Sequence, residues 1–170
     1  NNNIAYENRN AVLEEAGKLT GEARLSALRN AYQVATHDDV KERILLNLGF
    51  FKDTGSIPLM IQALDEAGIV RRAAARSLAH IGSPAAYGAK AKLLEVLPRT
   101  DARDKAQVVW ALAVLKESAA VPAILEEFAA GHLQNLEALD KSPSFDPKVI
   151  IDVVGPQRIS SDEYLTHKDK

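Results

Sequence analysis

The sequence of 170 residues contains no cysteine, which excludes disulfide bonds, thiolate zinc sites and cysteine nucleophiles. Aromatic residues make up only 5% of it. Because β-sheet proteins are rich in aromatic and β-branched residues, this scarcity favours helices. No apolar run approaches the roughly 18 residues of a membrane span, and the first residues lack the pattern of a signal peptide. The composition therefore predicts a helical chain and does not indicate a cellular compartment.

The overall charge is small. The formal net charge is -2, so the chain as a whole does not attract nucleic acids or acidic membranes, and binding to either would need a local basic patch. Hydrophobic residues make up 46%, enough for the core of one domain. Because the chain opens on Asn1 rather than Met, we expect a processed or excised piece of a longer protein.

An apolar pattern recurs about every thirty residues. Its anchors, spaced 30 and 34 residues apart, are Leu48, Leu78 and Leu112, and a fainter copy lies 32 residues earlier at Ala16. Apolar residues stand four before and three after each anchor: Val12 and Leu19, Ile44 and Phe51, Ala74 and Ile81, and Val108 and Leu115. A second apolar segment follows in each copy, so each unit predicts two helices joined by tight turns.

The turn signals place the helix ends. We expect helices at 5–19, 22–36, 39–52, 56–66, 69–82, 84–97, 102–116 and 118–130. The predicted helix starts are a capping box from Asp39 to Glu42, Ser83 before Pro84, Thr100 or Asp101, and Asp146 before Pro147. The β-branched run at 149–154 leaves a strand as the alternative to a last helix.

These units define the expected domain organisation. Repeats at 5–36, 37–66, 67–98 and 99–131 form one domain over 1–131, followed by a capping segment at 132–154 and a loose tail or linker at 155–170. Because a single hairpin cannot cover its own apolar face, neighbouring hairpins must stack. The expected fold is all-α, an α-solenoid (alpha-alpha superhelix) of about four hairpins.

The segments 39–48 and 70–84, with Pro58, resemble HEAT repeats of the short bacterial type, which phycobilisome-lyase-like proteins also carry. The resemblance implies a curved stack with second helices along the concave face. It also implies that a basic residue early in each first helix pairs with an acid of a neighbouring repeat, here Lys41, Arg71 and Lys105. Asp104 stands where Val is usual and Gly88 where Pro is usual, which predicts irregular third and fourth units.

The sequence contains no recognisable catalytic or metal-binding pattern. His37, His80, His132 and His167 are not at metal-ligand spacing, and the sequence has no phosphate-binding loop or nucleophile elbow. We expect His80 to be a partly buried structural residue and Trp110 to lie in the core. No metal, cofactor or catalytic residue is therefore predicted.

The remaining function is binding. We expect a non-enzymatic scaffold that binds a protein or peptide, including another domain of the same polypeptide, on the concave face. The partner-binding candidates are Leu59, Met60, Gln62, Tyr87, Lys90, Lys92 and Glu126. For Leu59 and Met60, core packing is the competing interpretation. A basic patch of Arg71, Arg72, Arg76, Arg99, Arg103 and Lys105 makes nucleic-acid binding the alternative, and the resemblance adds bilin-lyase-like or chaperone activity.

Overall fold

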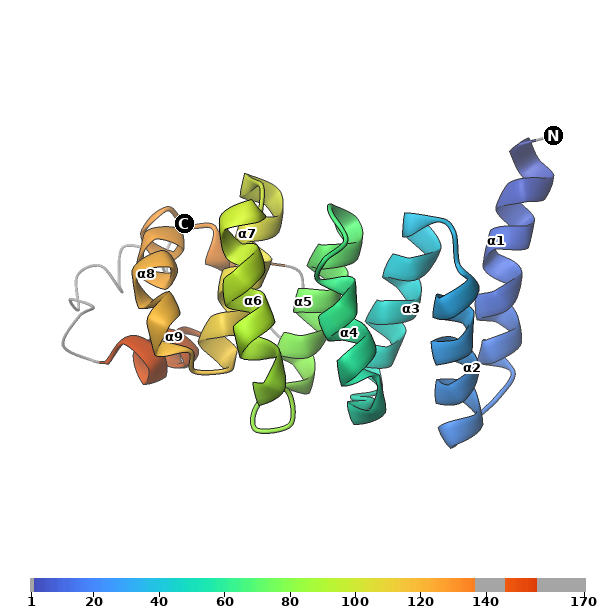
Figure 1. Ribbon diagram of the computed structural model, residues 1–170, viewed down its shortest axis with the longest axis horizontal. Coiled ribbons are helices and arrows are strands. Elements are labelled where there is room, and N and C mark those ends of the chain that lie inside the picture. The colour runs from blue at the N-terminus through green and yellow to red at the C-terminus, as the bar shows by residue number, and fades with distance from the viewer. Residues whose placement is uncertain (1, 137–145, 156–170) are drawn as a thin grey trace.

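The computed structural model describes residues 2–136 and 146–155, and only the backbone of residues 2–9 and 135 (Figure 1). The α-helices are α1 (Asn2–Gly17), α2 (Gly21–Val34), α3 (Asp38–Phe50), α4 (Ile57–Ala63), α5 (Ile69–Ile81), α6 (Lys90–Val96), α7 (Ala102–Val114), α8 (Val121–Ala129) and α9 (Pro147–Val154). Short 3-10 helices are η1 (Thr54–Ser56), η2 (Tyr87–Ala89), η3 (Leu97–Arg99), η4 (Ser118–Ala120) and η5 (Leu133–Asn135).

Successive hairpins lie side by side in chain order, from α1/α2 to α7/α8 (Figure 1). The first helices α3, α5 and α7 pack directly on one another, and α9 packs against α7 and α8. No strand occurs among the residues described. The fold is the predicted all-α solenoid of stacked hairpins.

The anchors form its core. Leu48, Leu78 and Leu112 are fully buried, as are the residues four positions earlier, Ile44, Ala74 and Val108. Trp110 is also buried, as predicted, with 7% of its surface exposed. The repeated apolar spacing therefore marks the face of each first helix that packs into the stack.

The flanking positions at the first end depart from the pattern. Val12 and Leu19 of the first unit are 38% and 40% exposed. Phe51 is 39% exposed at the end of α3, where the Arg24 guanidinium lies 5.2 Å from its ring centroid. The prediction that these residues continue the buried face is wrong.

Helices α3 and α5 approach each other closely at Gly49 and Ser77. A Cβ atom at Gly49 would lie 2.6 Å from both Cβ and Oγ of Ser77. The Ser77 hydroxyl donates a hydrogen bond of 2.8 Å to the Leu45 carbonyl, so the two helices are joined as well as packed. Only a glycine permits this spacing.

Two of the predicted helix starts are confirmed. The Asp101 carboxylate accepts hydrogen bonds from the backbone N–H groups of Arg103 and Asp104, which begins α7. Asp146 accepts one from Lys148, and α9 follows, so the strand alternative at 149–154 is wrong. Both carboxylates satisfy N–H groups that a helix start leaves without an intrahelical acceptor.

The other two expected caps are wrong. α3 begins at Asp38, within one residue of the expected start, but its N-cap is His37, which makes no side-chain capping bond. α6 begins at Lys90 instead of residue 84. Gly82 ends α5 with a φ of +74°, and its carbonyl accepts a 2.9 Å hydrogen bond from Ala86, so a turn occupies the residues expected to start the helix.

Ion pairs tie helices together, but not as the resemblance implied. Lys41 pairs with Glu66 at 2.7 Å and Lys105 lies 3.6 Å from Glu126, so both bind acids of their own units. The first two units are joined instead by Arg29 of α2, whose guanidinium forms two 2.8 Å hydrogen bonds with Asp53, in the turn after α3.

Candidate functional site

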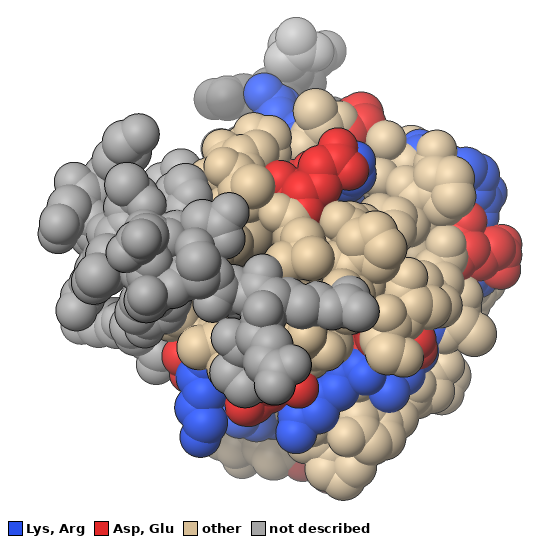
Figure 2. All heavy atoms as spheres, turned by 90° about the vertical axis from the view of Figure 1, so that its left-hand side faces the viewer, with Lys and Arg blue, Asp and Glu red and all other residues tan. Residues whose placement is uncertain are grey.

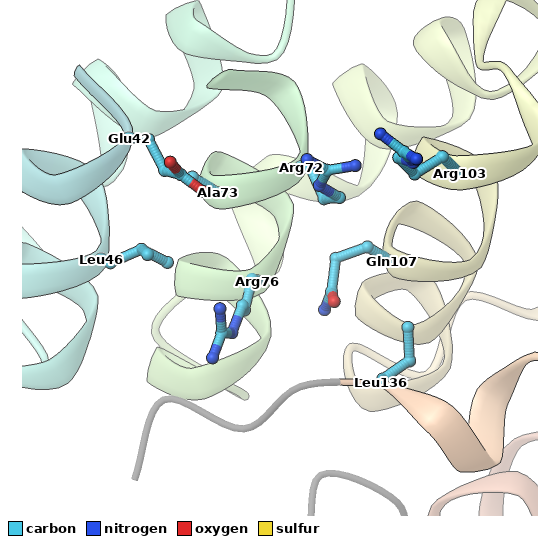
Figure 3. A pocket seen from close by; sticks show the side chains of 8 residues that line it. All are labelled: Glu42, Leu46, Arg72, Ala73, Arg76, Arg103, Gln107 and Leu136. Atoms are coloured by element: carbon cyan, nitrogen blue, oxygen red, sulfur yellow. The ribbon is translucent and has the colours of Figure 1, made fainter. Parts of the chain in front are cut away.

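A groove opens between the first helices α3, α5 and α7, with a volume of about 440 Å³ (Figure 3). The described residues that line it are Glu42 and Leu46 of α3, Arg72, Ala73 and Arg76 of α5, Arg103 and Gln107 of α7, and Leu136 beyond η5. Leu46, Ala73 and Leu136 make part of the wall apolar. The groove thus combines cations with a small apolar surface.

Helix geometry brings its polar side chains together. Arg72 and Arg76 are four residues apart on α5, and Arg103 and Gln107 are four apart on α7, so each pair projects from one face of its helix. Figure 3 shows Arg72 and Arg103 at one end, Gln107 between α5 and α7, and Arg76 lower on α5. Three guanidinium groups from two helices therefore line one hollow.

Arginine is the commonest charged residue along the described wall of the groove. Among the described residues that line it, Glu42 is the only acidic one. Arg103 is exposed, and its side chain forms no hydrogen bond or ion pair with any residue that the structure describes. Behind the groove, Arg72 Nη1 lies 3.8 Å from Oδ1 of Asp104, a separation too long for a hydrogen bond. Arg103 is thus available to an anionic ligand.

Arg71, Arg99 and Lys105, also expected in the basic patch, are engaged elsewhere. The buried Arg71 donates hydrogen bonds of 2.9 Å to the Leu64 carbonyl and 3.3 Å to the Arg99 carbonyl. The Arg99 guanidinium pairs with Asp65 at 3.3 Å, and Lys105 pairs with Glu126. The single predicted patch is therefore wrong: half of it lines the groove and half joins helices.

The part of the chain that matches a known family includes most of this site. The HEAT repeats family matches residues 25–113, more than half of the chain, from within α2 to within α7. The chain is a HEAT-repeat protein. No curated protein and no solved structure matches it. HEAT repeats generally mediate protein–protein interactions and typically have no catalytic activity, and all lining residues except Leu136 fall within the matched range.

Two partner-binding candidates lie inside the HEAT stack. Met60 is fully buried and Leu59 is only 9% exposed. Both belong to α4, whose buried face packs against α5. They cannot contact a partner in the folded protein, so their assignment as binding residues is wrong and the core interpretation holds.

The other candidates lie on the second-helix side of the HEAT repeats, and none of them lines the groove. Gln62 is exposed, and Tyr87 is 42% exposed with Lys90 Nζ 4.3 Å from its ring centroid. Lys92 Nζ lies 2.9 Å from Asp65, whose pKa is lowered chiefly by that contact. Glu126 faces Lys105. Much of this charge is already paired.

The end of the stack where α8 and α9 lie carries charge of both signs. Figure 2 views this end, with Lys and Arg along its lower edge and Asp and Glu beside them. Most of the remaining described surface in this view is neither acidic nor basic. This intermixing of charges differs from the groove, where arginines predominate.

Metal and membrane sites find no support in the described part of the chain. No group of three or more His, Asp or Glu side chains there is placed to hold a metal ion. His132 Nδ1 instead lies 2.8 Å from Glu127, and His80 is half-buried in α5, as expected of a structural histidine. Among the same residues, every helix is too short or too polar to cross a bilayer.

Sequence reasoning missed Gln107, Glu42 and Leu46 as lining residues. A signal was present, because Arg72 with Arg76 and Arg103 with Gln107 both have the four-residue spacing of one helix face. The spacing did not show that these two faces adjoin, which depends on the register of α5 against α7. Asp104 was noted in the sequence as a departure from the repeat, and the structure places it beside the groove.

Proposed function

We propose that this protein binds an acidic segment of a partner protein in the groove between α3, α5 and α7. The observation that supports it is the position of Arg72 and the exposed Arg103 on one hollow whose described lining has a single acidic residue, Glu42. Guanidinium groups bind carboxylates through paired, charge-assisted hydrogen bonds. Leu46 and Leu136 offer an apolar surface for a neighbouring side chain of the same segment.

A protein ligand suits the groove better than a nucleic acid. No described lining residue is aromatic, so bases would find no stacking surface. The net charge of -2 also opposes a long polyanion, whereas a short acidic segment meets only the local field. The polar lining likewise does not favour an apolar pigment, whose site would be mostly hydrophobic.

The second-helix side is the competing place for a partner to dock. Tyr87 and Lys90 are its best candidates, because Tyr87 is exposed and aromatic residues often anchor interfaces. Gln62, Lys92 and Glu126 would surround them. The two faces make opposite predictions for substitutions at Arg103 and at Lys90.

The test is fluorescence anisotropy with a short labelled peptide that contains several aspartates and one leucine. The matched control peptide has asparagine in place of each aspartate. We expect the acidic peptide alone to bind, and Arg72→Ala and Arg103→Ala each to weaken binding about ten- to hundredfold, since a charge-assisted hydrogen bond contributes about 1.5 to 3 kcal/mol. Lys90→Ala serves as the control variant and should bind as the wild type does.

Three results would argue against the proposal. Equal binding of the two peptides would remove the role of charge. Loss of binding in Lys90→Ala, with none in Arg103→Ala, would move the partner to the second-helix side. Tighter binding of labelled duplex DNA, with an affinity that falls steeply with salt, would replace the protein ligand with a nucleic acid.

A further inference from the structure

Asp104 is an acidic residue at a core position of the repeat. The equivalent residues of the two preceding units are Val40 and Val70, both buried. Asp104 is equally buried, with 2% of its surface exposed. A carboxylate at such a position costs free energy unless its oxygens are hydrogen-bonded.

The Asp104 carboxylate is only partly satisfied. The backbone N–H of Gly68, which precedes α5, acts to lower the pKa of this carboxyl group. Its Oδ1 atom is buried and has no hydrogen-bond partner among the described residues. Among the described residues, Oδ1 forms an ion pair with Arg72, whose Nη1 lies 3.8 Å away. A buried, unsatisfied anion thus lies directly behind an arginine of the groove.

The charges around Asp104 shift its pKa in both directions. Burial raises the pKa of its carboxyl group above the usual value, and the nearby Asp101 raises it further. Arg72 and Arg71 of α5, together with the backbone N–H of Gly68, oppose this rise. The protonation of Asp104 therefore depends on whether Arg72 interacts mainly with Asp104 or with another anion.

We propose that Asp104 couples the binding of an acidic ligand in the groove to the uptake of a proton. The inference rests on the proposed function, because it concerns the same groove. Ionised Asp104 neutralises part of the Arg72 charge and repels an incoming carboxylate. Once protonated, Asp104 leaves the charge of Arg72 to the ligand.

The direction of the pH effect follows from linkage. A bound carboxylate near Arg72 adds negative charge close to Asp104, which raises the pKa of Asp104 above its value in the free protein. The complex therefore holds more protons than its separated components. Affinity must rise as the pH falls toward that pKa, and the effect must vanish where Asp104 cannot ionise.

The experiment compares the full chain with Asp104→Asn, which keeps the side-chain shape and removes the charge. Isothermal titration calorimetry with the aspartate-leucine peptide, in buffers of different ionisation enthalpy, counts the protons taken up. We expect uptake by the wild type to exceed that of Asp104→Asn, because the contribution of the peptide is common to both. At neutral pH the variant should bind about five- to tenfold tighter, and the gap should close on acidification.

The outcomes separate this inference from the proposed function. Equal proton uptake and equal affinity in the two proteins, with Arg103→Ala still weakening binding, would overturn the role of Asp104 alone. Weaker binding by Asp104→Asn would also overturn it, since the charge would then assist binding. Failure of both proteins to bind the peptide would overturn both proposals.

Discussion

Replacing Gly49 with alanine should separate α3 from α5. The added Cβ would lie 2.6 Å from Cβ and Oγ of Ser77 and 2.8 Å from its Cα. Unstrained carbon atoms approach to about 3.5 to 4.0 Å, so the two helices must move apart by about 1 Å. The atoms in the way include backbone, which cannot rotate aside as a flexible side chain would.

The sign of the effect distinguishes packing from helix propensity. Alanine is favoured over glycine inside a helix by about 1 kcal/mol, so propensity alone predicts a more stable protein. Overpacking costs about 1 to 3 kcal/mol, and separation also weakens the Ser77–Leu45 hydrogen bond, which contributes about 1 kcal/mol. We expect Gly49→Ala to lower the free energy of unfolding by about 1 to 3 kcal/mol.

Urea denaturation followed by circular dichroism measures the change. Gly17→Ala is the matched control, because no atom lies within 4 Å of a Cβ placed at Gly17 at the end of α1. Its stability should stay equal or rise by less than about 1 kcal/mol. Adding Ser77→Gly to Gly49→Ala should restore part of the loss. A Gly49→Ala protein as stable as the wild type would refute the close packing of α3 on α5.

Three further substitutions test the core and its charges. Leu78→Asp places an unpaired charge at a fully buried anchor, so circular dichroism should show loss of the folded state. Native helicity with an unchanged melting temperature would contradict the predicted stacking. Burial would raise the pKa of Asp53, but hydrogen bonds from Arg29 and Ser56 lower it below its usual value. Asp53→Asn should therefore cost about 2 to 3 kcal/mol in urea denaturation at neutral pH, and the difference from wild type should shrink as the pH falls through the lowered pKa; a pH-independent difference would oppose this. Asp104→Val should raise the free energy of unfolding by about 1 to 2 kcal/mol. The gain should be larger at neutral than at acidic pH, because a buried carboxyl group with a raised pKa destabilises the wild-type protein as the pH rises. Equal stability of the two proteins at every pH would contradict the cost assigned to the buried charge.

Sequence spacing predicted the stack because each buried face repeats independently of its neighbours. Leu48, Leu78 and Leu112 are equivalent within their helices, and this local periodicity is sufficient to predict stacked hairpins. Asp101 was also predictable as a helix start, since an N-cap depends on residues only two or three positions away.

The late start of α6 and the burial of Met60 were less accessible to sequence reasoning. The signal at Ser83 and Pro84 is local, but the turn closed by Gly82 and Ala86 takes precedence over it. Met60 lies on a short helix of seven residues, over which apolar periodicity does not separate a core face from a binding face. Tertiary packing therefore decides the burial of Met60, whereas the local turn decides where α6 begins.

The groove could be predicted only in part. The sequence indicated the basic residues, but it did not separate Arg71, which is buried against backbone carbonyls, from Arg72, which lines the groove. Adjacent residues on a helix point about 100° apart, so a run of cations in sequence is divided between surfaces. Which of them meet depends on how α5 and α7 are aligned.

Nuclear magnetic resonance of arginine side chains tests the central claim most directly. Isotope-labelled protein is titrated with the aspartate-leucine peptide, and the guanidinium signals are followed together with the backbone. We predict that the signals of Arg72, Arg76 and Arg103 shift first and most. Shifts that centre on Tyr87 and Lys90, with these three arginines unchanged, would contradict binding in the groove.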